Sequence, residues 1–485
     1  MIITSKNNNH YFLDYEKRSL LLLHPQLEKQ IQQGEDQRSN KISSSSTDDY
    51  YTRKYSFLKK AGYFSKKTST PEIFHYSPDF IRKSIANSTH IVFEVTERCN
   101  LKCKYCGYGE YYTTYGTRAT RDLNFTKAKL LLDYLYQYWN SSDNLSYGKK
   151  ITISFYGGEP LMNFALIQQI VEYSQQLKLT KNRFAYSMTT NGTLVDRYID
   201  FLVKWNFSLF ISLDGDQRHN AFRVFRNGKE SFSRIFDNLI KIRNNYPEFF
   251  QKNIPFNSVF HKKSSFLEVS SFFKSKFDKS AQFLMLNTFG VNNEKKEQFK
   301  EIYKNPFQTL DEESECMPEI KDKISPMSLN IFTFMQYHNS NLFYEFNELR
   351  FPFTQLSPPT GTCIPFQKKL YLRPDGTILP CEKISPDFTM GKISDSEVII
   401  DYEKIASYYN QLFDNIVDKQ CRKCENYFCK SCIFTMDQEG NELIHCKKSL
   451  GKKRFSAYLQ SIIDECEESP GIISEISKNL KILDL

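Results

Sequence analysis

The segment Cys99-Asn-Leu-Lys-Cys103-Lys-Tyr-Cys106 sets three cysteines at spacings of three and two intervening residues, directly after the apolar run Ile91–Val95. Thiolates are soft, strong ligands of iron, and these spacings let one loop wrap a corner of an iron–sulfur cubane. Four thiolates would close the shell of a [4Fe–4S] cluster, whereas three leave one iron open to bind a small molecule and pass it an electron. The alternative, a zinc knuckle, needs a fourth ligand, and the nearby histidine, His90, lies at the entry of the run.

Three later segments place glycine and polar residues directly after apolar runs. They are Tyr156-Gly157-Gly158-Glu159-Pro160, Thr189-Thr-Asn191-Gly192-Thr193 and Ser212-Leu-Asp214-Gly215. Glycine has no Cβ, so Gly157 and Gly158 allow the backbone to approach a ligand closely, and Pro160 ends the strand because it donates no backbone hydrogen bond. Asn-Gly and Asp-Gly pairs also favour tight turns, so the two later segments fit either ligand contact or turn formation.

Together these segments resemble the radical S-adenosylmethionine (SAM) enzymes, and the resemblance extends roughly from Ile91 to Cys446. It implies that Cys99, Cys103 and Cys106 hold a [4Fe–4S] cluster that binds SAM. It also implies the chemistry: the reduced cluster passes one electron into the S–C5′ bond of SAM, giving methionine and a 5′-deoxyadenosyl radical, which abstracts hydrogen from a strong C–H bond.

The resemblance further implies which residues contact SAM. Carried over by motif position, the contacts fall on Tyr105 for the adenine, on Gly157, Gly158 and Glu159 of the GGEP segment for the methionine ammonium group, and on Asn191, Ser212 and Arg223 for the ribose or the carboxylate. Arg226 is an alternative to Arg223 as the carboxylate clamp. An ordinary packed aromatic is the alternative role for Tyr105.

Short apolar runs alternate with helical segments from residue 91 onward. Strands are predicted at Ile91–Val95, Ile151–Tyr156, Phe184–Thr190, Phe207–Leu213, Ile254–Val259 and Gln282–Leu286, and helices between them at Thr126–Tyr138, Phe164–Leu177, Asp196–Lys204, Phe232–Asn244 and Ser264–Lys274. This order predicts right-handed βαβ units and a parallel sheet, so the fold class is α/β. Six such units resemble the partial (β/α)6, TIM-like barrel of the radical SAM enzymes, in which ligands sit at the C-terminal ends of the strands.

Seven more cysteines lie near the C-terminus, as Cys363-x12-Gly376-x4-Cys381, Cys421-x2-Cys424-x4-Cys429-x2-Cys432 and Cys446. Their order resembles the SPASM pattern, although two internal gaps of the third block are each one residue shorter than usual. The resemblance implies two auxiliary [4Fe–4S] clusters, the first held by Cys363, Cys381 and Cys432 and the second by Cys421, Cys424, Cys429 and Cys446. A zinc ribbon is the alternative, since C-x2-C pairs suit zinc equally well.

Two cysteines remain outside these sets. Cys316 is a possible fourth ligand of the first auxiliary cluster, and the alternative is an iron left open for a substrate thiolate. Cys466 lies on a predicted closing helix, Lys447–Cys466, and is expected to be a small core hydrophobe.

The domain boundaries are predicted as an N-terminal module at 1–88, a radical SAM core at 89–290, a connector at 291–360, a SPASM domain at 361–450 and a helical tail at 451–485. In the N-terminal module we expect a strand at His10–Asp14 and helices at Leu20–Ile31 and Ser56–Gly62. Small N-terminal modules in related peptide-modifying enzymes often grip a leader peptide, and the alternative is a strap packed against the barrel.

Composition frames these predictions. A chain of 485 residues with 40% hydrophobic content is long enough for two or three domains. The N-terminal residues lack the apolar stretch of a secretion signal, and no run of 18 uncharged apolar residues predicts a membrane span. Twelve cysteines clustered at ligand spacing favour metal sites in a reducing cytoplasm over disulfides. The net charge of +9 indicates a lysine-rich surface rather than a nucleic-acid stripe.

Enzymes with a SPASM region mostly modify peptides, so the resemblance implies a peptide maturase. Its expected partners are a ribosomally made precursor peptide, cross-linked for example through a thioether, and an electron donor such as flavodoxin or ferredoxin. An alternative is an anaerobic sulfatase-maturing enzyme, which forms formylglycine; Glu382, directly after Cys381, is then the candidate catalytic base. A second alternative, of a different class, is a non-catalytic iron–sulfur or zinc module. The GGEP segment argues against it, because a sensor needs no site for the SAM ammonium group.

Overall fold

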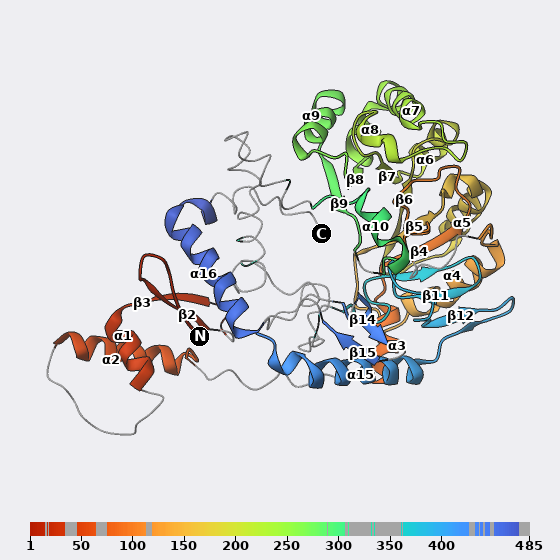
Figure 1. Cartoon of the computed structure of the whole chain (residues 1–485). Helices are drawn as coiled ribbons and strands as arrows, with labels where there is room; N and C mark the ends of the chain where they lie inside the picture. The colour runs from red at the N-terminus through yellow and green to blue at the C-terminus, as the bar shows by residue number, and fades with distance from the viewer. Residues whose placement is uncertain are drawn as a thin grey trace. The chain divides into compact units, whose positions relative to one another are not determined.

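The computed structural model in Figure 1 divides the chain into two compact units. The barrel unit comprises His75–Glu313 and Cys363–Asn410, and the terminal unit comprises Met1–Phe74, Ser314–Thr362 and Gln411–Leu485. The structure describes residues 1–14, 17, 19–33, 46–64, 75–112, 119–288, 290–305, 309, 331, 334, 360, 362–425, 432–435, 437–439, 442–446 and 451–474. Cys316 and Cys429 lie outside the described residues.

Six parallel strands form the centre of the barrel unit. They are β4 (His90–Thr96), β5 (Lys150–Gly157), β6 (Arg183–Thr190), β7 (Ser208–Ser212), β8 (Phe256–Phe260) and β9 (Ala281–Met285), and each pairs with the next in chain order. Every strand predicted from residue 91 onward is therefore present, within about two residues of its predicted bounds. The connections contain the α-helices α4 (Phe125–Trp139), α5 (Phe164–Gln176), α6 (Ile199–Lys204), α7 (Phe232–Asn245), α8 (Pro247–Asn253) and α9 (Phe266–Phe277). They also contain short 3-10 helices, labelled η: η1 (Pro160–Asn163), η2 (Val195–Arg197) and η3 (His219–Phe222).

The two faces of the sheet differ because side chains alternate along each strand. On β5, Ile153 and Phe155 have no exposed surface, whereas Thr152 and Tyr156 are partly exposed. On β8, Phe256 packs against Phe250 of α8 and against two phenylalanines of α9. Full burial of such a side chain contributes about 1.5–3 kcal/mol, so the helix-covered face holds the sheet in place. The opposite face is left for polar residues at the strand ends.

Four short strands extend this sheet beyond β4. They are β10 (Leu370–Leu372), β11 (Thr377–Leu379), β12 (Gly391–Ile393) and β13 (Val398–Ile399), and β10 runs parallel to β4 with Leu372 beside Phe93. Residues 363–410 thus belong to the barrel unit, whereas a separate SPASM domain was predicted to begin at residue 361. The reason is that backbone groups of β10 find their hydrogen-bonding partners on the otherwise free edge of β4. The barrel unit also contains α3 (Pro78–Ala86), η4 (Asn293–Lys295) and α10 (Lys296–Lys300). Because α3 belongs to it, this unit begins before residue 89, where the radical SAM core was predicted to begin.

In the terminal unit, β1 (Ile2–Thr4), β2 (His10–Asp14) and β3 (Ser19–Leu23) form an antiparallel sheet, followed by α1 (Pro25–Gln33) and α2 (Ser46–Lys60). The helix predicted from Leu20 is wrong at its start, because residues 20–23 pair with β2 as a strand. Pro25 then opens α1, where its fixed φ suits the first helical position. The helix predicted at Ser56–Gly62 is the end of the longer α2.

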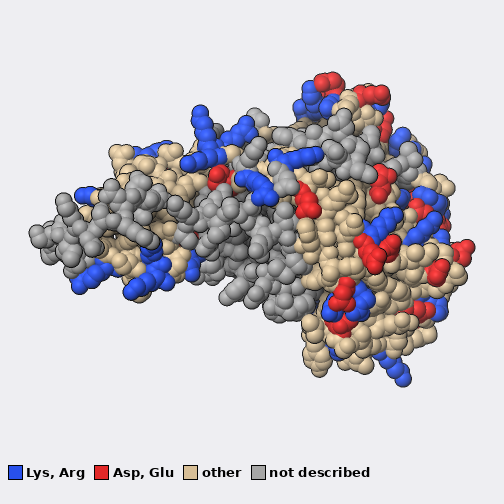
Figure 2. Space-filling view, turned by 90° about the horizontal axis from the view of Figure 1, so that it is seen from below, with Lys and Arg blue, Asp and Glu red and all other residues tan. Residues whose placement is uncertain are grey.

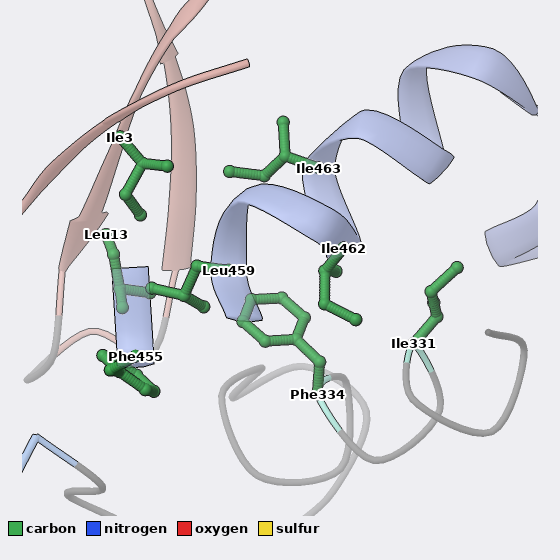
Figure 3. Close-up of a cluster of buried hydrophobic side chains, with 8 residues drawn as sticks. All are labelled: Ile3, Leu13, Ile331, Phe334, Phe455, Leu459, Ile462 and Ile463. Atoms are coloured by element: carbon green, nitrogen blue, oxygen red, sulfur yellow. The ribbon is translucent and has the colours of Figure 1, made fainter. Parts of the chain in front are cut away.

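The N-terminal strands pack against the helix α16 (Lys452–Glu468), although the two are more than 430 residues apart in sequence. Figure 3 shows the buried cluster that joins them: Ile3, Leu13, Ile331, Phe334, Phe455, Leu459, Ile462 and Ile463. At its border Lys6 N donates to Asp464 and Tyr11 Oη to Glu467, both at 2.8 Å. As expected, Cys466 packs against this cluster. The unit also contains the second half of α15 (Tyr402–Lys419), together with η5 (Cys421–Lys423), η6 (Ile433–Thr435), β14 (Asp437–Glu439) and β15 (Glu442–His445).

Both signs of charge occur on the surface. Figure 2 shows Lys and Arg interspersed with Asp and Glu over the barrel unit, at the right of this view. Within the part of the chain that the structure describes, no helix has the length and apolar composition needed to cross a membrane.

Candidate active site

The three-cysteine loop follows β4 at the C-terminal edge of the parallel sheet. Lys102 N donates to Val224 O at 2.7 Å and Lys104 N to Phe222 O at 3.0 Å, so these hydrogen bonds hold the loop against the end of η3 and the residues after it. Cys99 is buried, and Cys103 and Cys106 are partly exposed. The three thiols therefore lie on one fixed loop at the edge where parallel barrels bind their ligands.

Gly157 and Gly158 fit against the backbone that leads into this loop. A Cβ on Gly157 would lie 2.2 Å from Thr96 O, and a Cβ on Gly158 would lie 2.0 Å from Arg98 O. Two backbone hydrogen bonds hold the contact, from Gly158 N to Thr96 O and from Glu159 N to Arg98 O, each 2.8 Å long. We expected these glycines to make room for a ligand; the close approach seen here is between β5 and the start of the cysteine loop.

Glu159 has no exposed surface, and the protein itself supplies donors to both of its carboxylate oxygens. Oε1 accepts from Thr190 Oγ1 at 2.7 Å and from Leu161 N at 3.2 Å, and Oε2 accepts from Asn191 N at 2.8 Å. Burial raises the pKa of Glu159 to about 7, despite these three donors. Contact with a SAM ammonium group stays a prediction, and it would require one of these hydrogen bonds to be shared or broken.

Asn191 ties the end of β6 to the first cysteine. Its Nδ2 donates to Asn100 Oδ1 at 2.9 Å and lies 3.9 Å from Cys99 Sγ, while its Oδ1 accepts from Thr193 N at 3.0 Å. Arg226 also reaches this cysteine, donating from Nη1 to Cys99 O at 3.3 Å. Ser212 lies at the end of β7, is partly exposed and pairs in register with Asn257 of β8. Asn191 thus forms a turn with Thr193 and contacts the cysteine loop, and its contact with SAM stays a prediction.

A buried charged cluster lies beside the second and third cysteines. Arg223 Nη2 donates to Asp214 Oδ1 at 3.1 Å, and the Tyr105 hydroxyl donates to Asp214 Oδ2. The centroids of the His261 and Tyr105 rings are 5.6 Å apart, and the Arg223 guanidinium carbon lies 5.4 Å from the centroid of the Tyr105 ring. Although burial raises the pKa of Asp214, the Arg223 charge and the neighbouring donors lower it more, so the pKa lies below its ordinary value. Arg223, predicted as a carboxylate clamp, therefore already holds a carboxylate of the protein.

Sequence reasoning missed Asp214 and His261 as parts of this cluster. The segment with Asp214 was expected to make a ligand contact through Ser212 or to form a turn, yet the Asp214 side chain accepts from Val259 N at 2.9 Å and so links the end of β7 to β8. His261 follows β8 directly, and a polar residue immediately after a parallel strand was the available signal.

The C-terminal cysteines are distributed over both units. In the barrel unit Cys363 precedes β10 and Cys381 follows β11; Cys421, Cys424, Cys432 and Cys446 lie in the terminal unit. The set of Cys363, Cys381 and Cys432 stays a prediction, as does the set that includes Cys429. Among the described residues, no three Cys, His, Asp or Glu side chains are grouped so that they could hold a metal ion.

Glu382, the candidate base, forms an ion pair with Lys369 at 2.8 Å. Burial raises the pKa of Glu382, but the Lys369 charge and hydrogen bond lower it more, so the carboxyl group is held ionised.

The model of the radical SAM superfamily matches residues 93–256, which run from β4 to the first residue of β8. This part of the chain is a radical SAM domain. The prediction of a radical SAM domain is therefore confirmed, whereas the reaction that the whole chain catalyses is not identified by this match.

Two relatives match part of the chain. An uncharacterized protein of Methanocaldococcus jannaschii is 35% identical over 143 residues, or 29% of this chain and 44% of that protein. The radical SAM cyclopropyl synthase TigE of Paramaledivibacter caminithermalis is 28% identical over 172 residues, or 34% of each chain. The chain thus spans less than half the length of these curated relatives.

Among solved structures, native anSMEcpe with bound AdoMet and the Kp18Cys peptide superposes with a TM-score of 0.52 at 16% identity, covering 80% of this chain and 99% of that one. A hexahistidine-tagged form of anSMEcpe with bound AdoMet gives 0.50 at 18% identity, covering 81% and 95%. At such identity the likeness concerns the fold, and it confirms the predicted α/β radical SAM architecture.

Proposed function

We propose that the chain is a radical SAM peptide maturase that removes a hydrogen atom from a ribosomally made precursor peptide, with a cross-link such as a thioether as the expected product. The observation that carries the proposal is the attachment of the cysteine loop to the strand ends. Gly157 and Gly158 fasten its start to β5, and Asn191 connects Cys99 to β6. Similarity to the radical SAM enzyme TigE supports radical chemistry, and fold likeness to anSMEcpe, which was solved with the Kp18Cys peptide, supports a peptide substrate.

The donor chemistry fits the cofactor that the family implies. Cys99, Cys103 and Cys106 would hold the [4Fe–4S] cluster, since three thiols on one pinned loop leave an iron free for SAM. Cluster and SAM together supply, when bound, the radical that takes a hydrogen atom from a strong C–H bond.

The protein's own residues orient the reactants in this scheme. Arg223, Asp214 and Tyr105 form a buried, hydrogen-bonded cluster, so the loop beside Cys103 and Cys106 is held rigid. Tyr156 and Ser212 are partly exposed on the sheet face away from the helices, at the strand ends where such barrels bind their ligands. Rigid positioning of this kind lowers the activation barrier of hydrogen abstraction, because the reacting atoms need no further ordering.

The auxiliary cysteines would hold two further [4Fe–4S] clusters, Cys363, Cys381 and Cys432 the first, and Cys421, Cys424, Cys429 and Cys446 the second. Their proposed role is to position the peptide or to accept its electron, and a flavodoxin or ferredoxin would reduce the SAM cluster. Residues 1–88 are proposed to grip the leader of the precursor. The barrel part of this stretch begins at His75, so the leader site would lie within the preceding strands and helices.

Formylglycine formation is the second candidate, because Glu382 follows Cys381 and the fold resembles that of anSMEcpe. The Glu382 carboxylate forms an ion pair with Lys369 at 2.8 Å, so this pair would have to open before Glu382 could accept a proton from the substrate.

The test is anaerobic reconstitution of the full chain, followed by reduction with SAM in the presence and absence of candidate peptides encoded by neighbouring reading frames. We expect methionine and 5′-deoxyadenosine, and a mass change in the peptide. Stoichiometric zinc with little iron, or no cleavage of SAM, would favour the non-catalytic module. Modification of a sulfatase peptide alone would favour formylglycine formation.

A further inference from the structure

The hairpin β10–β11 connects two predicted auxiliary-cluster ligands to the core of the barrel unit. Cys363 lies before β10 and Cys381 directly after β11, while β10 itself is paired with β4. Because β4 leads into the loop with Cys99, one pair of adjacent strands separates the two cysteine sites. Their relative position therefore depends on how firmly this pair is held at the strand ends.

Arg373, the residue after β10, places its guanidinium between two carboxylates of the β4 end. Its Nε lies 3.5 Å from Glu94 Oε2, and its Nη2 lies 3.4 Å from Glu97 Oε1. The side chain of Arg373 is 10% exposed, and those of Glu94 and Glu97 are 1% and 2% exposed. On its own turn Arg373 also lies 3.8 Å from Asp375. One cation thus faces three acidic groups from two segments of the barrel unit.

The two carboxylates depend on Arg373 to different extents. Glu94 Oε1 accepts from Tyr108 Oη at 3.0 Å, whereas Oε2 has no hydrogen-bond partner among the described residues and forms an ion pair with Arg373. Glu97 has a second partner, Arg121, whose Nη2 donates to Oε1 at 2.7 Å and whose Nε donates to Oε2 at 3.0 Å. A buried carboxylate without a compensating charge is costly, so Glu94 ties the end of β4 to Arg373.

We propose that Arg373 is a positioning residue that fixes the hairpin between Cys363 and Cys381 to the segment leading into Cys99. The planar guanidinium is suited to this role because its separate N–H groups reach both carboxylates at once, whereas a lysine ammonium is a single point of charge. The separation of the two cysteine sites is then set by Arg373 as well as by the β4–β10 hydrogen bonds. The consequence for peptide modification rests on the proposed function; the mechanical link between the segments does not.

Arg121 supplies a matched control within the same network. It binds Glu97 and lies 3.5 Å from Asp375, but it is 48% exposed, belongs to the segment before α4 and makes no ion pair with Glu94 among the described residues. Arg121→Gln removes an arginine of the same charge and its contact with Asp375, but it leaves the contacts of Arg373 with Glu94 and Glu97 in place. Arg373→Lys keeps the charge but not the fork, and it should rescue only part of the effect.

The first experiment follows hydrogen exchange in the cluster-free full chain. Arg373→Gln should speed exchange about ten-fold or more in both residues 90–98 and residues 370–379, while the rest of the barrel keeps its parental rates. Arg121→Gln should leave residues 370–379 at the parental rate. Unchanged exchange in those residues in Arg373→Gln would overturn the proposal, and so would a uniform increase across the barrel unit, because that indicates general destabilisation.

If Arg373→Gln does not fold, the double variant Glu94→Gln with Arg373→Met removes both charges together, which leaves no buried carboxylate unpaired at Glu94. It should show the same paired loss of protection, and parental protection in both segments would refute the link.

The second experiment uses the reconstituted protein. Arg373→Gln should keep SAM cleavage without peptide within about two-fold of the parent, broaden the magnetic interaction between the reduced clusters in electron paramagnetic resonance, and slow peptide modification about 10–100-fold. An unchanged interaction with unchanged modification would overturn the positioning role. A parental protein that holds no clusters would instead refute the proposed function, and the exchange result would still decide the link.

Discussion

Gly158→Ala should damage the candidate site through a backbone collision. The added Cβ would lie 2.0 Å from Arg98 O and 2.8 Å from Glu97 O, whereas Cβ contacts under 3.0 Å are essentially never observed. Both neighbours are backbone atoms and cannot rotate away, so the segment entering Cys99 must move by at least about 1 Å. The hydrogen bonds from Gly158 N to Thr96 O and from Glu159 N to Arg98 O would be strained by the same movement.

The expected cost is about 2–6 kcal/mol in the free energy of unfolding, from overpacking of about 1–3 kcal/mol and disturbed buried hydrogen bonds of about 1–3 kcal/mol. Urea denaturation of the cluster-free chain measures it through tryptophan fluorescence. The two tryptophans of the chain, Trp139 and Trp205, both lie in the barrel unit, so the signal reports that unit.

Gly148→Ala is the matched control. Gly148 has φ +77° and no atom within 4 Å of the position that an added methyl group would take, so only backbone strain of about 1–2 kcal/mol is expected. Iron analysis after reconstitution should show that Gly158→Ala loses the Cys99 cluster while Gly148→Ala keeps it. A Gly158→Ala protein that is as stable as Gly148→Ala and binds parental iron would refute the reasoning.

Three further predictions concern the same unit. Replacing Cys99, Cys103 and Cys106 together by Ala should remove about four of about twelve irons and abolish SAM cleavage, as measured by iron, sulfide and 5′-deoxyadenosine analysis; parental iron content would contradict the ligand assignment. Burial raises the pKa of Glu159 from 4.5 to about 7, so the folded chain holds this proton more tightly than the unfolded chain does. The free energy of unfolding should therefore fall by about 3 kcal/mol as the pH rises from 4.5 to about 7, and it should stay level above that pH. Glu159→Gln cannot titrate, so urea denaturation at pH 5 and pH 8 should show a flatter dependence than the parent; equal slopes would disprove the role of this carboxyl. Asp214→Asn leaves Arg223 buried beside a neutral partner and should cost about 3–5 kcal/mol, with much of it recovered in the double variant Asp214→Asn with Arg223→Met; no recovery would show that the pair is not the source of the loss.

The amino-acid sequence by itself determined the βα order, the α/β class and the place of the three-cysteine loop. These features are local: apolar runs with alternating exposure predict strands, and a motif directly after a strand lies at its C-terminal end in a parallel sheet. The run Ser19–Leu23 shows the limit of such patterns. Four consecutive leucines fit a helix or a strand equally well, and pairing with β2 is what selects the strand.

Only the tertiary structure decided which partner each site residue takes. Gly157 and Gly158 face the backbone of residues 96–98, Arg223 is paired with Asp214, and Arg373 reaches Glu94, which lies 279 positions earlier in the sequence. The N-terminal strands likewise find their core on α16. Such contacts join segments brought together by sheet pairing and burial, and a pattern read over ten or twenty residues holds no information on which distant segment supplies the partner.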